Sequence, residues 1–285
     1  NLAGGVSTYI QGKNYILKNN LFYDSSVLLD LVNNATLENN LFSNSYFASV
    51  YGLVNSKIVN NSFMYNNSYV GNGPGYYNAP SKVSGIYLDA GTPSSYGDIR
   101  SYLVNITSNN FVNSPYYSIY MKNISDILVY NNTIIYSPLL SNQSLSHIGI
   151  VVTSISSKIN ISNNQIVSPQ GISADGTNKV TLFHNNISYC QTGLNLSVSN
   201  TEVMAYDNLF SNSFNVVSAG LVNGVFNSTK FCSTSNKNIL GGNCTGGNYY
   251  SGYTGQDLNF DGIGDSAYQI GYTLDTDHQL FWLLA

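Results

Sequence analysis

The feature that most constrains this chain is a short phrase, Asn-Asn followed by an apolar residue, that recurs along most of its length. Its variants include "ILKNNLF", "KIVNNSF", "LVYNNTI" and "FHNNISY", with "AYDNLF" as an altered form. The second residue of the pair recurs at steps of 20, 21, 49, 22, 32, 22 and 22 residues. A short repeat of this period predicts a solenoid, in which each repeat forms one coil that packs on its neighbours.

The residues around each phrase predict strands rather than helices. Val180 and Leu182 in "NKVTLF" alternate with polar residues, as do Ile159 and Ile161 in "SSKINIS". This period of two, together with many β-branched and aromatic residues, is typical of strands. The leucine-rich repeat is the competing short solenoid, but its spaced leucines are missing. We therefore predict an all-β fold, a right-handed parallel β-helix (a pectin-lyase-like solenoid) of roughly ten coils.

The Asn-Asn pair fits the turn between two such strands. A sharp turn needs a left-handed residue, which Asn tolerates better than any residue except Gly. Stacked coils place equivalent residues about 4.8 Å apart, so buried amides can hydrogen-bond into a ladder. Every phrase has Asn second, whereas Asp207 occupies a first position. We therefore expect the first residue to face solvent and the second to form the ladder: Asn20, Asn40, Asn61, Asn110, Asn132, Asn164, Asn186 and Asn208.

The repeats also predict the domain organisation. The coils should occupy residues 1–231, with a Gly-, Pro- and Tyr-rich loop inserted at about 66–99 that contains one coil strand, "SGIYLDA". Residues 232–285 lack the Asn-Asn repeat and should form a C-terminal cap, because an open solenoid end exposes unpaired strand backbone. The N-terminal end shows no cap of its own. There we expect contact with another domain or a second copy, burying Ile10 and its neighbours.

Composition excludes two classes of partner. Only 8% of residues are charged, the net charge is -4, and the single arginine is Arg100. A chain without a basic stripe is a poor ligand for nucleic acid. No run of about 18 apolar residues is present, so this segment contains no predicted membrane span. Its aromatic content of 13% indicates a folded rather than a disordered chain.

Twelve Asn-x-Ser/Thr sequons point to an extracellular or cell-surface location, although an Asn- and Ser-rich chain creates some by chance. Asn186 is expected to be unmodified because it belongs to the predicted ladder. The predicted sites for N-linked glycans are Asn34, Asn60, Asn66, Asn105, Asn123, Asn131, Asn142, Asn160, Asn195, Asn227 and Asn243.

The tail contains an acidic, Gly-rich loop in which oxygen-bearing residues alternate, as in an EF-hand-type calcium loop. Position 12 should be a bidentate Glu but is Tyr268, so Asp275 or Asp277 could complete the coordination sphere. Oxygen ligands favour Ca²⁺ over zinc or copper. A polar hairpin with solvated acids is the alternative. The predicted ligands are Asp257, Asn259, Asp261, the carbonyl of Ile263, and Asp265.

The three cysteines divide into a pair and a single residue. Cys232 and Cys244 bracket a short loop in the tail, where an exported location favours a disulfide over two free thiols. Cys190 lies in a coil and is expected to be a small core residue.

The run "GGNYYSGYTGQDLNFDGIGDSAYQI" closely resembles the C-terminal motif of archaeal surface proteins with right-handed β-helices of the NosD-like, carbohydrate-binding/sugar-hydrolase (CASH) type. The coil repeats resemble those of the same family from about residue 14 to 231. The resemblance implies the β-helix fold but no single activity. The family name refers to copper-site maturation, and no Cys/Met/His cluster in this sequence supports copper binding.

Catalytic residues are not evident in the coils. Glycoside hydrolysis needs two carboxylates facing one sugar, and the acids here are sparse. The best cluster is Asp89, Asp98 and Arg100, which a surface ion pair explains more simply. The histidines are far apart in the sequence, at His147, His184 and His278.

These observations favour a non-catalytic, exported β-helix that serves as a rigid structural or adhesion module, such as a surface-layer, adhesin or filament component. Its expected partners are other surface or matrix proteins, including copies of itself end to end. The alternative is a β-helix that binds or cleaves polysaccharide from its Tyr-rich loop.

Overall fold

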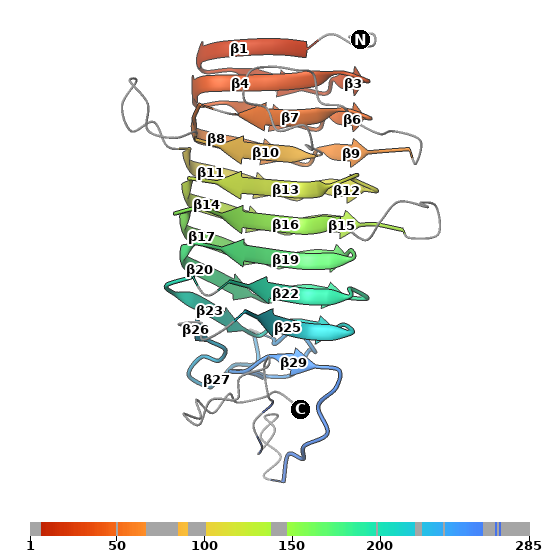
Figure 1. Ribbon diagram of the computed structural model, residues 1–285, viewed down its shortest axis with the longest axis vertical. Coiled ribbons are helices and arrows are strands. Elements are labelled where there is room, and N and C mark those ends of the chain that lie inside the picture. The colour runs from red at the N-terminus through yellow and green to blue at the C-terminus, as the bar shows by residue number, and fades with distance from the viewer. Residues whose placement is uncertain are drawn as a thin grey trace.

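The structure of the chain is a computed structural model that describes residues 7–49, 51–66, 85–90, 101–137, 147–197, 199–219, 224–235, 237–258, 266 and 268. Every regular element in these ranges is a β-strand. One sheet has 18 strands and a second has nine, and all of their ladders are parallel (Figure 1). The strands stack in nine coils within the described ranges, which confirms the predicted parallel β-helix.

Each coil contributes one strand to each of three rows. The first row contains β1 (Ser7–Lys13), β4 (Ser26–Asn33), β7 (Tyr46–Ser49), β10 (Ile86–Asp89), β13 (Tyr117–Lys122), β16 (Ile148–Thr153), β19 (Gln170–Asp175), β22 (Thr192–Leu196) and β25 (Phe214–Ser218). The second row contains β2 (Ile16–Lys18), β5 (Thr36–Glu38), β8 (Leu53–Val59), β11 (Tyr102–Thr107), β14 (Ser125–Tyr130), β17 (Ser157–Ser162), β20 (Asn178–Phe183), β23 (Val203–Tyr206) and β26 (Gly224–Val225).

The third row is the separate nine-stranded sheet. It contains β3 (Leu21–Tyr23), β6 (Leu41–Ser43), β9 (Ser62–Met64), β12 (Asn110–Val112), β15 (Thr133–Ile135), β18 (Gln165–Val167), β21 (Asn186–Ser188), β24 (Leu209–Ser211) and β29 (Tyr249–Tyr250). The first two rows form one sheet because β4 is long enough to pair with both β7 and β8.

The core is a set of columns that run through the coils, because equivalent inward side chains lie above one another. Phe22, Phe42, Phe63 and Phe111 of the third row stack with ring centroids 4.5–4.9 Å apart. Each is at most 3% exposed. Ile134, Ile166, Ile187, Phe210 and Tyr250 continue this column to the last coil. Burial of these large side chains supplies the main driving force for stacking the coils.

The bend between the second and third rows, here called the second corner, uses one left-handed residue in eight of the nine described coils. These residues have φ between 53° and 59°. The left-handed conformation was expected for Asn, but Ser, His and Asp also adopt it here. The residues are Asn19, Asn39, Asn60, Ser108, Asn131, Asn163, His184 and Asp207.

The residue after each of these eight left-handed residues, together with Asn248 of the ninth coil, forms a continuous asparagine ladder. Each side-chain Nδ2 donates to the Oδ1 of the next coil at 2.8–3.0 Å. The same Oδ1 accepts the backbone N–H of the previous ladder residue, at 3.0 Å between Asn185 and Asn208 for example. The ladder consists of Asn20, Asn40, Asn61, Asn109, Asn132, Asn164, Asn185, Asn208 and Asn248.

Two predicted ladder residues, Asn110 and Asn186, were wrong. The left-handed position is taken by Ser108 in one phrase and by His184 in the other, so the Asn pair sits one residue later. Asn109 and Asn185 therefore point inward. Asn110 and Asn186 lie on the outer face of the third row because successive strand residues alternate between faces. The first position of the phrase also does not always face solvent, because Asp207 is buried.

The inserted loop and the tail both return to the coil stack. Within the predicted insertion, β10 pairs with β7 on one side and β13 on the other. In the tail, β27 (Phe231–Cys232) and β28 (Cys244–Thr245) form an antiparallel hairpin, after which β29 pairs with β24. The coil stack therefore continues past residue 231, where we had placed the domain boundary.

At the N-terminal end, Ile10 is partly buried against the core. No helix long and apolar enough to cross a membrane is found among the residues that the structure describes.

Candidate functional site

A cluster of aromatic and charged side chains lies on the outer face of the first row, over β7, β10 and β13. The register pairs Ala48 with Tyr87 and Tyr87 with Tyr120. Because Ile86 and Leu88 point into the core, Tyr87 must point outward. We call this cluster the tyrosine face; its members are Tyr46, Tyr87, Tyr117, Tyr120, Asp89 and Lys122.

The tyrosine face is held together by stacking and by one shared carboxylate. The rings of Tyr87 and Tyr120 stack at 4.8 Å, and the centroid of Tyr117 lies 5.2 Å from that of Tyr120. Tyr87 Oη donates to Asp89 Oδ2 at 3.0 Å. Lys122 Nζ donates to the same oxygen at 3.1 Å. The side chains of Asp89 and Tyr87 are almost fully buried, although both lie outside the core.

Both stacked phenols remain protonated at neutral pH. Burial raises the pKa of Tyr87 well above its usual range, and the negative charge of Asp89 raises it further. The same two causes raise the pKa of Tyr120 to about 12. The partly exposed rings of Tyr117 and Tyr120 therefore offer aromatic surface beside the neutral hydroxyl group of Tyr120, a combination suited to contact with a ligand that is apolar on one side and hydroxylated on the other.

The structure describes one member of the predicted cluster of Asp89, Asp98 and Arg100. Asp98 and Arg100 lie outside the described residues, and Asp89 is paired with Lys122. The sequence analysis missed Lys122, although the signal was present. Aligning the strands "GIYLDA" and "SIYMKN" places Asp89 beside Lys122, as the register does.

The described histidines do not form a catalytic arrangement. His147 is buried between Ser118 and Ser168, at 3.4 and 3.2 Å. His184 Nδ1 lies 2.8 Å from Asp207 Oδ2, and Asp207 Oδ1 accepts the backbone N–H of Ile239 at 2.9 Å. This His–Asp pair therefore helps to attach the tail to the coils. His278 lies outside the described residues.

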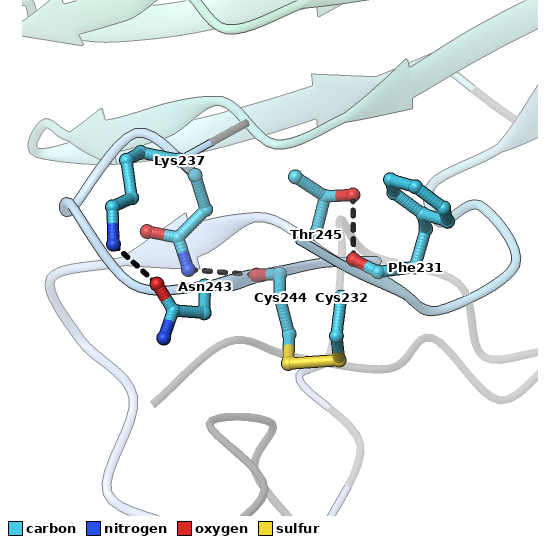
Figure 2. The surroundings of a disulfide bond; sticks show 7 residues. Phe231, Cys232, Lys237, Asn243, Cys244 and Thr245 are labelled. Carbon is cyan, nitrogen blue, oxygen red and sulfur yellow. Dashed lines mark hydrogen bonds between the residues drawn. A yellow bond between two sulfur atoms is a disulfide. The ribbon is translucent and has the colours of Figure 1, made fainter. Parts of the chain in front are cut away.

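The hairpin in the tail is fastened by a disulfide between Cys232 and Cys244 (Figure 2). The buried amide of Asn238 organises the loop between them, accepting the N–H groups of Leu240 and Gly242 at 3.0 and 2.7 Å. Asn238 Nδ2 donates to the carbonyl of Cys244 at 2.8 Å. Figure 2 also shows Lys237 beside the amide of Asn243. Cys190 is a buried free thiol in the core.

The two flanks of the predicted calcium loop are fixed to the last coils. Tyr253 Oη donates to the carbonyl of Ser266 at 3.1 Å. The ring of Tyr268 stacks on Tyr250 at 4.2 Å, which extends the third-row core column by one more ring. Asp257 is half-buried. The remaining predicted ligands, Asn259, Asp261, Ile263, Asp265, Asp275 and Asp277, lie outside the described residues.

We propose that this loop binds Ca²⁺ and thereby stabilises the end of the stack. Carboxylates at positions 257, 261 and 265 repel one another unless a cation neutralises them. Free Ca²⁺ at 100 times its Kd should stabilise the folded state by about 2.7 kcal/mol. We expect Ca²⁺ that is added back to the chelator-treated protein to raise its melting temperature and to protect the chain beyond Cys232 from protease. Asp261→Asn should abolish both effects.

Asp126→Asn is the matched control, since Asp126 is a partly exposed acid of the coils that pairs with Lys158 at 3.4 Å. It should leave the response to Ca²⁺ unchanged. The calcium site would be refuted if neither the melting temperature nor the rate of proteolysis changed on adding Ca²⁺, on chelation or in Asp261→Asn.

The stacked parallel strands and the asparagine ladder define this protein as a parallel β-helix protein. Residues 139–255 match the family model of NosD, described as a periplasmic copper-binding protein. That segment is less than half of the chain and runs from just before β16 to just beyond β29. No curated protein matches the sequence.

The described residues do not fit a copper site. Copper prefers thiolate, thioether and imidazole ligands that are grouped together. Here Cys232 and Cys244 are joined to each other, and Cys190 and His147 are each buried in the coils. Within the described ranges, no group of three or more His, Cys, Asp or Glu residues could hold a metal ion.

Proposed function

We propose that this chain is a non-catalytic, exported β-helix that acts as a rigid structural or adhesion module at the cell surface or in the extracellular matrix. The observation that carries the proposal is the unbroken ladder from Asn20 to Asn248, which links all nine described coils. With the stacked core columns beside it, the ladder resists bending and shearing between coils. Such a rod suits a spacer, an adhesin stalk or a filament unit.

Three observations support export. NosD, the protein whose family model matches part of the chain, is described as periplasmic. The Cys232–Cys244 disulfide is of a kind that persists in oxidising compartments. The tail motif resembles that of archaeal surface proteins. The partners we propose are other surface or matrix proteins, including copies of the same chain arranged end to end.

A second candidate function is binding of polysaccharide, and the tyrosine face favours it. Tyr117 and Tyr120 are half-buried, so part of each ring remains accessible. An aromatic ring can stack on the apolar face of a sugar while hydroxyl and ammonium groups bind its polar edge.

One experiment separates these functions. The full chain is incubated with a panel of acidic and neutral polysaccharides, and both binding and release of products are measured. The structural role predicts no products and no binding that depends on the tyrosine face. Products that disappear in Asp89→Ala would overturn it in favour of cleavage. Binding lost in Tyr120→Ala but kept in Tyr130→Ala, an exposed tyrosine of the second row, would establish the second candidate.

A further inference from the structure

The sequons of this chain occupy two kinds of position in the coil. Asn34 lies between β4 and β5, at the bend we call the first corner. Asn123 occupies the same corner between β13 and β14, with φ of 54°, but is only partly exposed. Asn60 and Asn131 lie at the second corner. By contrast, a second set lies within strands, where neighbouring coils flank each side chain. The strand sequons are Asn105 in β11, Asn160 in β17, Asn186 in β21 and Asn195 in β22.

The corner asparagines project from the coil. Asn34, Asn60 and Asn131 have φ of 62°, 54° and 55°, and all three are exposed. The middle residue of each sequon is buried, so the Asn and the hydroxyl residue two positions later both face outward. A corner therefore presents the two side chains that a sequon needs on a convex surface.

Each corner amide has a hydrogen atom to spare. Asn34 Nδ2 donates to Asn14 Oδ1 at 2.7 Å, and Asn60 Nδ2 donates to Asn39 Oδ1 at 2.6 Å. Asn131 Nδ2 donates to the hydroxyl of Ser108 at 3.2 Å. An amide nitrogen carries two hydrogens. A glycosylated amide keeps one of them, so these contacts between coils are compatible with an attached sugar.

The strand asparagines lie between side chains of the adjacent coils. Asn105 is flanked by Lys57 and Leu128, and Asn160 by Leu128 and Thr181. Coils are about 4.8 Å apart, so a sugar on either residue would overlap these neighbours.

Two of the strand amides are additionally sunk into the sheet surface. The Oδ1 atoms of Asn160 and Asn186 are buried and have no hydrogen-bond partner. Neither side chain therefore stands clear of the sheet.

We propose that Asn34, Asn60 and Asn131 carry N-linked glycans and that the strand sequons at Asn105, Asn160, Asn186 and Asn195 stay unmodified. This revises the sequence-based prediction of glycans at Asn105, Asn160 and Asn195. In this reaction Nδ2 attacks the anomeric carbon of a lipid-linked glycosyl diphosphate. The N–C bond forms as the C–O bond to the diphosphate breaks. The lipid diphosphate leaves, and a base of the transferase takes the proton from Nδ2.

The positions of the three sites have a consequence for the rod. Asn60 and Asn131 share the second corner two coils apart, at about 10 Å. Asn34 lies on the first corner, at the opposite edge of the second row. Glycans at these sites therefore border the second row on both edges and screen its face from protein partners.

The test uses the full chain secreted from an N-glycosylating host. Glycans are released enzymatically in heavy-oxygen water, and peptide mass spectrometry measures the occupancy of each site in the folded, monomeric fraction. We expect high occupancy at the three exposed corner sequons, Asn34, Asn60 and Asn131, and none at the four strand sequons.

Two new sequons provide a matched comparison. Leu41→Thr completes a sequon at Asn39, a second-corner residue with φ 56°. Val112→Thr completes one at Asn110, a strand residue of β12. Both replaced side chains face outward, and threonine suits strands. Asn39 should gain a glycan and Asn110 should not.

Equal occupancy of strand and corner sequons, or a glycan on Asn110 in folded Val112→Thr, would overturn the proposal. So would bare corner sites in a host that fully modifies a co-secreted reporter.

Discussion

Asn185→Ala should lower the free energy of unfolding by at least about 3 kcal/mol, whereas Asn186→Ala should change it by less than about 1 kcal/mol. Asn185 Oδ1 accepts the N–H and the Nδ2 of Asn164, at 3.0 and 2.9 Å. Its Nδ2 donates to the carbonyls of Ile161 and Phe183 and to Asn208 Oδ1, at 2.8–3.1 Å. The Asn185 side chain that makes these hydrogen bonds is fully buried.

Asn185→Ala is destabilising because polar groups around position 185 lose a hydrogen-bond partner. Alanine at position 185 removes the side-chain partner of the Asn164 N–H and of the carbonyls of Ile161 and Phe183, the second of which keeps the N–H of Asn163. Each unsatisfied group costs about 1–3 kcal/mol. Asn186 is different, since its buried Oδ1 already lacks a partner. Removing that oxygen relieves a desolvation cost and breaks no contact of the ladder.

The adjacent pair is its own control, since the substitution is identical and the positions are one residue apart. Urea unfolding measures the shift in midpoint, and limited proteolysis reports whether one coil opens before the rest, because a solenoid need not unfold in a single step. Equal destabilisation by the two variants, or a larger effect at Asn186, would place the ladder one residue later.

The coil architecture follows from the sequence because its signal is repeated nine times. The alternation of apolar and polar residues predicts strands and their inward residues, such as Val180 and Leu182. The repeat of about 21 residues predicts that these strands stack in parallel. The position of the ladder residue within each phrase was harder to predict. It is set by its distance from the inward core residue of the following strand, and not by its place in the Asn pair. The relation common to all nine ladder residues is Asn-x followed by an inward Phe, Ile or Tyr, as in Asn109 to Phe111.

Counting back from the inward residue would also have found Asn248, two residues before Tyr250. We missed it because the segment from Phe231 to Cys244 interrupts the repeat with a hairpin. A period cannot predict where the chain leaves the stack and returns to it. Only the pairing of β29 with β24 locates that return.

The tyrosine face was predictable in part. The alternation of β10 and β13 indicates which tyrosines face outward, and register places Asp89 beside Lys122. The burial of Tyr87 could not be predicted, because the sequence pattern describes the inner face of a coil and not what covers its outer face. The raised pKa of Tyr87 depends on that burial.

Acidification should destabilise the protein through His147, a residue that no proposed function uses. Its ring is 1% exposed, stacks on Tyr136 at 4.8 Å and contacts the hydroxyl groups of Ser118 and Ser168. Burial lowers the pKa of His147 from 6.5 to about 3. The unfolded chain therefore binds a proton below pH 6.5, whereas the folded chain does not until about pH 3. Between these two pH values the free energy of unfolding therefore decreases as the pH is lowered, by about 1.4 kcal/mol per pH unit for this residue.

Glutamine at position 147 can keep one donor and one acceptor for the two serines but does not titrate. Between pH 6.5 and about pH 4.5, the wild-type protein should therefore lose about 2.3 kcal/mol more unfolding free energy than His147→Gln. Urea unfolding across this range measures the difference. Nuclear magnetic resonance of the imidazole protons provides a second readout that needs no variant, since His147 should stay neutral in the folded protein down to about pH 4. Parallel stability curves for the two proteins, or a ring that titrates near 6.5, would show that His147 is accessible to protons in the folded state. The hydrogen bonds to Ser118 and Ser168 would then open without unfolding the coils around them.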